Sequence, residues 1–312
     1  MEIDVIIPLY KPGKELFTLL DKLGSQSVPV HQVILLNTEE KYFEQLIYGT
    51  RFLETYQNIK VYHVSKREFD HGGTRRMGVK KSSADVFVMM TQDAMPKDDR
   101  LIEKLVEPLQ GEVAVAYARQ LPREDSTPVE SYTREFNYPA KSRIKSAADL
   151  DSLGIKTFFC SNVCAAYRRE IYEELGGFVK HTIFNEDMIY AAKAVEAGYA
   201  VAYAADAQVV HSHNYTNGQQ FHRNFDLGVS QAEHPEIFAA YPSESEGKRM
   251  VKDVTVYLRS NHMSAGLPHF YMQCACKYAG YLLGKNYRRL PEKWVLAFTS
   301  NKEYWKHNRK DV

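Results

Sequence analysis

Residues 3–36 read IDVIIPLYKPGKELFTLLDKLGSQSVPVHQVILL and contain two patterns in turn. The first seven are mostly apolar and β-branched, which predicts a strand. A Pro-Gly pair at 12–13 breaks this pattern, and a helix is expected over 14–26 before a second apolar run at 33–36. A strand, a helix and another strand in this order indicate parallel strands joined by a crossover helix.

The same alternation continues through much of the chain. Further strands are expected at 60–64, 86–90 and 113–118, and helices at 42–56, 74–82, 99–109, 168–175 and 186–197. Apolar runs without polar alternation are typical of a sheet that is covered on both faces. We therefore expect an α/β fold, a parallel sheet flanked by helices. The polar segment 123–156 is expected to be a long loop or helical excursion, which in a compact domain is often functional.

Length and composition exclude several classes of protein. The 312 residues suit one large domain, or one with an appendage. Forty Lys and Arg against 39 Asp and Glu leave a net charge of +1, which excludes a nucleic-acid partner bound by bulk charge. No apolar run is long enough to span a membrane, acidic residues at 2 and 4 argue against a secretory signal, and four cysteines make no disulfide framework. We expect a cytoplasmic protein.

Three polar clusters follow expected strands, where open α/β sheets bind their ligands. They are Pro8-Leu9-Tyr10, the segment 69–76 with the sequence FDHGGTRR, and Thr91-Gln92-Asp93. Backbone N–H groups of a Gly-Gly turn at a helix start, next to arginines, can bind a phosphate. The other interpretation of His71-Gly72-Gly73 is a plain strand-to-helix turn.

Asp93 is a candidate metal ligand. It follows the apolar run 86–90, where an ionised carboxylate is costly unless it meets a cation. A magnesium ion held by one carboxylate and substrate phosphates would supply that cation. The alternative is a helix N-cap, a role that Asp98 suits better. His211 and His213 stand two apart at a strand end, so both face the same way, and either could add a nitrogen ligand.

Glu186 and Asp187 stand together at an expected helix start. The helix dipole alone would favour acids there. Functionally, one of them could take the proton from an acceptor hydroxyl as general base.

In order along the chain, these clusters resemble the family 2 glycosyltransferases, whose nucleotide-sugar-binding fold is called GT-A. The resemblance runs from Val5 to about His213. Matching stretches are Ile6-Ile7-Pro8-Leu9-Tyr10, Thr74-Arg75-Arg76-Met77-Gly78, Thr91-Gln92-Asp93 at the family's Asp-x-Asp motif, Arg168-Arg169 through Gly176-Gly177-Phe178, and Glu186-Asp187. Three departures are Thr91 for the first Asp, Arg76 for the usual Asn, and Asn37-Thr38 where relatives carry an acid. These departures bear on which nucleotide the donor carries more than on the type of reaction.

Within the family, Asp-His-Gly-Gly-Thr-Arg (70–75) and Thr-Gln-Asp-Ala (91–94) look like the rhamnosyltransferase branch. This branch uses dTDP-β-L-rhamnose to build bacterial surface polysaccharides. The resemblance implies an inverting transfer with Asp187 as base beside Glu186, and Mg²⁺ or Mn²⁺ on Asp93 with His211 or His213. Asn162 and Glu186 are expected on the acceptor side. The expected donor-binding residues are Pro8, Tyr10, Asn37, His71, Gly72, Arg75, Thr91, Gln92 and Asp93.

The C-terminal part differs in character. We expect the catalytic domain over 1–240 and a helical extension over 241–312. From residue 268 onward, nine Lys and Arg face three acids, a net +6, and aromatic residues crowd a helical pattern. Such a helix can lie on an anionic membrane, and the growing glycan acceptor is expected on a lipid carrier there, at the inner face. Equally, the helix could pack on the catalytic domain or on a second copy in a homodimer.

Other activities remain open from the sequence. The same fold could use a UDP-hexose, and a catalytically silent relative could act as an assembly partner. A metal-dependent hydrolase using His211 and His213 is a more distant alternative, because a second carboxylate-rich cluster is lacking.

Overall fold

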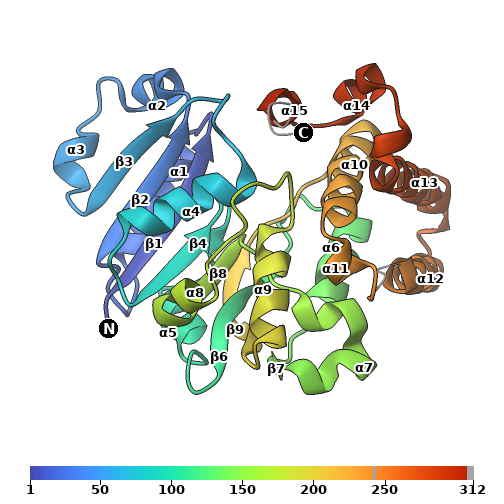
Figure 1. Cartoon of the computed structure of the whole chain (residues 1–312), viewed down its shortest axis with the longest axis horizontal. Coiled ribbons are helices and arrows are strands. Elements are labelled where there is room, and N and C mark those ends of the chain that lie inside the picture. Colours follow the sequence, from blue (N-terminus) through green and yellow to red (C-terminus); the bar gives the residue numbers. More distant parts are fainter. Residues whose placement is uncertain (242–243, 308–312) are drawn as a thin grey trace. The chain divides into compact units, whose positions relative to one another are not determined.

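The computed structural model describes residues 1–241 and 244–307 (Figure 1). Its strands are β1 (Ile3–Tyr10), β2 (Gln32–Thr38), β3 (Ile59–Val64), β4 (Val86–Met90), β5 (Met95–Pro96), β6 (Val113–Leu121), β7 (Arg143–Lys145), β8 (Cys164–Arg168) and β9 (Ala200–Val210). The first α-helices are α1 (Glu15–Gly24), α2 (Glu40–Ile47), α3 (Phe52–Thr55), α4 (His71–Lys81), α5 (Leu101–Val106), α6 (Pro128–Asn137), α7 (Leu150–Leu153), α8 (Arg169–Glu174) and α9 (Glu186–Glu196). The later ones are α10 (Asn217–Glu233), α11 (Pro235–Phe238), α12 (Glu244–Ser260), α13 (Leu267–Lys285), α14 (Glu292–Phe298) and α15 (Lys302–His307). Short 3₁₀ helices are η1 (Ala147–Asp149), η2 (Gly154–Phe158), η3 (Ser264–Gly266) and η4 (Tyr287–Arg289).

The strands form one mixed sheet in the order β3-β2-β1-β4-β8-β6-β9-β5, with β7 added beside β9. The expected parallel arrangement is confirmed for β3, β2, β1 and β4. It also holds for β6 with β9. Strands that the sequence did not predict run the other way: β8 is antiparallel to both β4 and β6, and β5 and β7 are antiparallel to β9. The strand β8 was not expected at all. The segment 123–156 contains α6, β7, η1 and α7, so it is an excursion with short elements.

Helices cover both faces of the sheet, as the apolar strands predicted. Val5 and Ile7 of β1 belong to the same core cluster as Leu16 and Leu19 of α1. Ile6, which points to the opposite face, meets α4: a Cβ added to Gly78 would lie 2.6 Å from its Cγ2. The α/β class with helices on both faces is therefore confirmed.

The chain divides into two compact units. Unit 1 contains residues 1–121, 139–181 and 186–211 and holds the sheet. Unit 2 contains 122–138, 182–185 and the part of 212–312 that the structure describes, and it is helical. The expected domains, 1–240 and 241–312, stay a prediction. The division into compact units is a different one, because it groups α10 with the later helices. Arg309, Lys310 and Asp311 of the basic tail lie outside the described residues.

Within the described ranges, the chain has no helix that is both long enough and apolar enough to cross a bilayer. The longest C-terminal helix, α13, packs along α10 instead (Figure 1). Three glycines allow the two backbones to touch: added Cβ atoms would lie 2.3 Å from Tyr281 O at Gly228, 2.2 Å from Phe221 O at Gly280, and 2.0 Å from Phe225 O at Gly284. These neighbours are backbone atoms, so they cannot rotate away as a side chain would.

We expect Gly284→Ala to destabilise unit 2, by about 1–3 kcal/mol of unfolding free energy, because one methyl group must separate two packed helices. Gly247→Ala is the matched control. Gly247 lies in α12 with no atom within 4 Å of an added Cβ, so alanine there should be neutral or stabilising through its helix propensity. Denaturant unfolding of both variants measures the difference, and equal stabilities would contradict the close packing of α10 on α13.

Candidate active site

The carboxyl ends of β1, β2 and β4 lie at one edge of the sheet, because these strands are parallel and adjacent. Gln92, just beyond β4, holds the end of β1 there. Its Oε1 accepts a hydrogen bond from the backbone N–H of Tyr10 at 2.9 Å, and its Nε2 donates to the carbonyl of Tyr10 at 3.2 Å. The Tyr10 ring stays 41% exposed and meets Tyr42 edge-on. Gln92 therefore positions an aromatic face at the edge.

Asn37 lies beside Leu9 at the same edge, fully buried. Its Nδ2 donates to Glu39 O at 3.1 Å and lies 3.0 Å from His63 Nδ1. Its Oδ1 and the neighbouring Thr38 Oγ1 have no hydrogen-bond partner in the described chain, and both are buried. A buried acceptor without a partner is costly in a finished protein core. These two oxygens fit a site that a polar ligand completes.

The Gly-Gly segment is the first turn of α4. Asp70 is the N-cap of this helix, and its Oδ1 accepts from the Gly73 N–H at 2.7 Å. A Cβ on Gly73 would lie 2.5 Å from Asp70 Oδ2 and 2.9 Å from Lys180 O, so only glycine fits. The structure shows a helix start here, which both interpretations of the segment share, and the buried Gly72 lies within it.

Arg75 of α4 forms a buried ion pair with Glu186 of α9. Arg75 Nε lies 3.1 Å from Glu186 Oε1, and the two side chains are 7% and 5% exposed. The guanidinium also donates from Nη1 to His71 O at 3.1 Å and lies 3.3 Å from His71 Nδ1. The segment with His71 and Arg75 is therefore in direct contact with the segment of Glu186, although the two are far apart in the sequence.

Asn162, just before β8, contacts both carboxylates of the acidic pair. Its backbone N–H donates to Asp187 Oδ2 at 2.8 Å, and its Nδ2 donates to Glu186 Oε1 at 3.0 Å. Tyr167 in turn donates from its hydroxyl to Asn162 Oδ1 at 2.7 Å. This amide fixes the two carboxylates relative to each other, whatever it contacts in a substrate.

The two carboxylates differ in pKa. Burial raises the pKa of Glu186, but the charges of Arg75 and His71 and the amide of Asn162 lower it by more, so its pKa lies below the usual value. Burial and the charge of Glu186 raise the pKa of Asp187 to about 7. Environments that separate neighbouring acids in this way are typical of acid–base chemistry. Glu186 stays ionised, while Asp187 can gain and release a proton near neutral pH.

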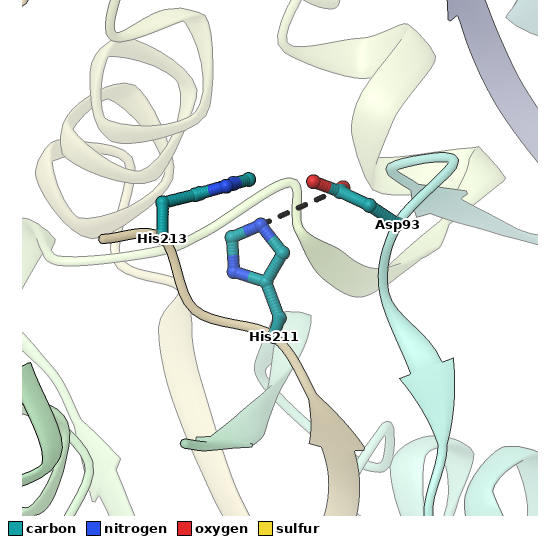
Figure 2. A group of neighbouring side chains, drawn as sticks. All are labelled: Asp93, His211 and His213. Atoms are coloured by element: carbon teal, nitrogen blue, oxygen red, sulfur yellow. Dashed lines mark ion pairs between the residues drawn. The ribbon is translucent and has the colours of Figure 1, made fainter. Parts of the chain in front are cut away.

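Asp93, His211 and His213 form the third group (Figure 2). His211 Nε2 lies 3.5 Å from Asp93 Oδ1, and one ligand atom from each of the three residues lies within 4.8 Å of the others. Asp93 follows β4, and both histidines follow β9. One carboxylate and two imidazoles make a set of oxygen and nitrogen ligands that suits a divalent first-row metal ion.

Gln120, which the sequence did not indicate, orients His211. His211 Nδ1 lies 3.0 Å from Gln120 Oε1, and Gln120 Nε2 donates to Ser161 Oγ at 3.0 Å. With its amide oriented in this way, Gln120 accepts the Nδ1 proton, so in a neutral His211 the lone pair of Nε2 faces Asp93. A lone pair and a carboxylate repel unless a cation lies between them, so the geometry fits a metal ion. No local pattern marks Gln120, because it reaches His211 only through the pairing of β6 with β9.

Arg76, one of the departures from the family pattern, does not face this edge. Its Nη1 donates to the backbone carbonyl of Phe178 at 3.0 Å and to that of Gly176. It therefore ties α4 to the Gly-Gly-Phe segment after α8.

Comparisons with known proteins agree with this architecture. The family model described as "Glycosyl transferase family 2" matches residues 4–176. The chain is 40% identical to the O-antigen chain rhamnosyltransferase RfbN of Salmonella typhimurium strain LT2, over 98% of this chain and 96% of that one. It is 37% identical to the O-antigen chain rhamnosyltransferase WbaN of Salmonella anatum, over 96% and 95%. 

Solved structures share the fold at low sequence identity. The mannosyltransferase PcManGT of Pyrobaculum calidifontis, in complex with GDP-Man and Mn²⁺, superposes with a TM-score of 0.61 at 15% identity, covering 91% of this chain and 87% of that one. Residues 1–349 of S. aureus TarS in complex with UDP give a TM-score of 0.51 at 14% identity, covering 93% and 92%. The expected GT-A type of fold is confirmed. The chain is a glycosyltransferase and belongs to glycosyl transferase family 2, in the branch of the O-antigen chain rhamnosyltransferases.

Proposed function

We propose that this enzyme transfers L-rhamnose from dTDP-β-L-rhamnose to a lipid-linked glycan acceptor, in surface polysaccharide synthesis at the inner face of the bacterial membrane. The observation that carries the choice of sugar is the 40% identity to RfbN over nearly the whole of both chains. WbaN, whose name states the same activity, supports it at 37%.

Asp187 is the general base in this proposal. The acceptor hydroxyl oxygen bonds to the anomeric carbon from the face opposite the nucleotide, and its proton passes to Asp187. The bond from the anomeric carbon to the diphosphate oxygen breaks, and dTDP leaves with the electron pair. One displacement inverts the β-linked donor and gives an α-L-rhamnoside. The raised pKa of Asp187 supports this role, because a base with a pKa near the working pH accepts the proton most effectively.

The remaining residues bind and orient. Tyr10, held by Gln92, offers an aromatic ring on which the nucleotide base can stack. The Oδ1 of Asn37, which has no hydrogen-bond partner in the described chain, offers an acceptor beside it. The hydroxyl of Thr91 also lacks a hydrogen-bond partner in the described chain, which supports a donor contact there. Asn162 serves the acceptor side by holding Asp187, and Glu186 serves it by raising the pKa of Asp187. The other proposed donor contacts are Pro8, His71, Gly72 and Arg75.

Asp93, His211 and His213 would hold Mg²⁺ or Mn²⁺. When bound, such an ion neutralises negative charge that develops on the departing diphosphate. Support comes from the ligand set and from the Gln120 contact that turns His211 Nε2 toward Asp93.

Metal binding tests the role of Gln120. We expect Gln120→Leu to weaken Mn²⁺ binding in the presence of dTDP about 10- to 100-fold, because His211 would lose the partner that fixes its tautomer. Asp93→Asn, which removes a ligand charge, should weaken it at least as much. Gln110→Leu is the matched control, since the Gln110 side chain is exposed and donates to Glu107 O in unit 1 away from this group. Electron paramagnetic resonance of bound Mn²⁺ measures all three; an unchanged affinity for Gln120→Leu would contradict the assignment.

Donor turnover tests the proposed function as a whole. The purified full chain is offered dTDP-rhamnose, UDP-glucose, UDP-galactose and UDP-N-acetylglucosamine, each with Mg²⁺, Mn²⁺ or chelator, and release of the nucleotide is followed. We expect metal-dependent release from dTDP-rhamnose alone. Preference for a UDP-sugar would overturn the assignment of the donor sugar but would leave the fold and the role of Asp187 as general base unchanged. No turnover or binding of any donor would favour a silent assembly partner.

A further inference from the structure

A cavity of about 310 Å³ lies in unit 2, between the end of α10, α11 and the end of α13 with η4. We call it the basic cavity. Pro235 and Phe238 of α11 give it an apolar wall. Lys285, Arg288 and Arg289 also line it, and as far as the structure describes the chain its lining includes no acidic side chain. The function proposed above does not use this cavity.

In the described part of the chain, one carboxylate interacts with an arginine of the basic cavity, Arg288. This carboxylate is Glu233, at the end of α10, whose two oxygens also accept hydrogen bonds from the hydroxyls of Tyr287 at 3.2 Å and Tyr304 at 2.9 Å. Two arginines against one described carboxylate leave a positive charge excess. Three cations around one concave space attract an anion, and arginines in particular bind phosphate with paired N–H donors. The chemistry therefore matches a phosphate group.

An exposed apolar stripe leads along α13 to the basic cavity. Tyr271, Tyr278 and Leu282 are 43%, 57% and 38% exposed. They are spaced by seven and then four residues, so they share one face of the helix, and Lys285 continues that face one turn after Leu282. The opposite side of α13 is the glycine face that packs on α10. Aromatic residues followed by cations are the composition of a helix that lies in the headgroup region of a membrane.

The wall of the basic cavity is held in place by the same packing. Gly284 lies between α13 and the backbone of α10, one residue before Lys285. Tyr281 donates from its hydroxyl to Oε1 of Gln231, which itself lines the cavity, at 2.9 Å. Lys285 therefore stands on a helix that is held in place before an anion binds, which lowers the backbone entropy lost on binding.

We propose that the basic cavity binds the phosphate-bearing headgroup of an anionic lipid, with the stripe of α13 lying among the neighbouring headgroups. The charge excess and the adjoining apolar stripe together favour a lipid over a free phosphate, which would use the cations alone. The proposal deepens the membrane-side location given under the proposed function and rests on it in that respect only; it does not depend on the sugar transferred.

Vesicle binding by the full chain tests the proposal. The double variant R288Q/R289Q removes two cations of the cavity, and K293Q/K302Q removes two exposed cations of the same tail that do not line it. Both lose the same net charge. Each protein is sedimented with mixed phosphatidylcholine–phosphatidylglycerol vesicles and with vesicles of phosphatidylcholine alone, at low and physiological salt. Circular dichroism and thermal unfolding check that the variants fold.

We expect wild type to bind the anionic vesicles and R288Q/R289Q to bind them about thirtyfold more weakly, which corresponds to about 2 kcal/mol at 1.4 kcal/mol per tenfold change. K293Q/K302Q should lose clearly less. Equal losses of vesicle affinity in the two variants would overturn the proposed cavity site, because binding would then depend only on the net charge of the tail. Binding of inorganic pyrophosphate, in chelator, that R288Q/R289Q abolishes while vesicle binding stays unchanged would overturn the lipid as the source of the phosphate. A wild-type dimer that does not bind vesicles would assign the stripe to a second copy and overturn the proposal.

Donor turnover is measured on the same proteins without vesicles. Vesicle binding that follows the expected pattern in a chain that releases no dTDP from dTDP-rhamnose would remove the proposed function and keep the lipid site. Normal turnover of dTDP-rhamnose with no vesicle binding would overturn the lipid site and leave the proposed function unchanged.

Discussion

Replacing Asp187 by asparagine is expected to lower the rate of sugar transfer by about 10²- to 10⁴-fold, the usual contribution of a general base. Asparagine has nearly the same shape, and its Oδ1 can still accept one of the two backbone N–H bonds that Asp187 receives, from Asn162 at 2.8 Å and from Met188 at 2.8 Å, so the site should keep most of its geometry. What it cannot do is take a proton from the acceptor hydroxyl. The loss should appear in kcat, with donor affinity nearly unchanged.

The pH dependence gives a second measurement on Asp187. Its pKa is raised to about 7, and the base must be ionised, so wild-type kcat should rise with pH and level off above about 7. A raised carboxyl pKa means that ionising the group costs folding free energy, so this cost grows as pH rises from the unfolded pKa of an aspartate, about 3.9, and is complete above about 7. Asp187→Asn removes that cost but loses one backbone hydrogen bond, so the stability of the variant relative to wild type should rise between pH 5 and pH 8, by thermal unfolding. Near-normal transfer in the variant with donor still bound would show that another group is the base.

Replacing Arg75 by methionine is expected to cost about 3–5 kcal/mol of unfolding free energy at neutral pH, because it leaves the buried charge of Glu186 without its partner. The loss should depend on pH. Arg75 helps to hold the pKa of Glu186 below its usual value, so the stabilisation it supplies is present above the unfolded pKa of a glutamate, about 4.3, and disappears as pH falls below it. Denaturant unfolding at several pH values follows this trend.

Two further variants separate the ion pair from simple loss of packing. The double variant Arg75→Met with Glu186→Gln removes the orphaned charge and should recover much of the stability at neutral pH. Arg100→Met removes one partner of the exposed pair with Glu103 and should change stability little, since solvent screens that pair. A neutral-pH loss in Arg75→Met that persists unchanged at low pH would mean that the ion pair is not the cause.

Much of the fold could be predicted from local pattern. Strands and helices alternate in the first half because apolar runs of β-branched residues end at Pro, Gly or polar clusters, and the lengths of the runs distinguish strand from helix. The edge of the sheet followed from the same reasoning, since parallel strands carry their carboxyl ends together. Asp93 and the pair at 186–187 stood out because a carboxylate after or beside buried structure needs a partner. The matching motifs in correct order then led to the family, which the comparisons confirm.

The tertiary structure alone decided what these residues touch. β8, with the sequence Cys-Ala-Ala-Tyr-Arg, has no strong strand pattern, and it is a strand because it fills the place between β4 and β6 in the antiparallel direction. That insertion puts Asn162, at its entrance, against both carboxylates. Local sequence encodes periodicity and burial, but strand order depends on the packing of the whole chain. The pairing of Arg75 with Glu186 and of Gln120 with His211, and with them the separation of the two carboxyl pKa values, therefore exist only once the sheet is assembled.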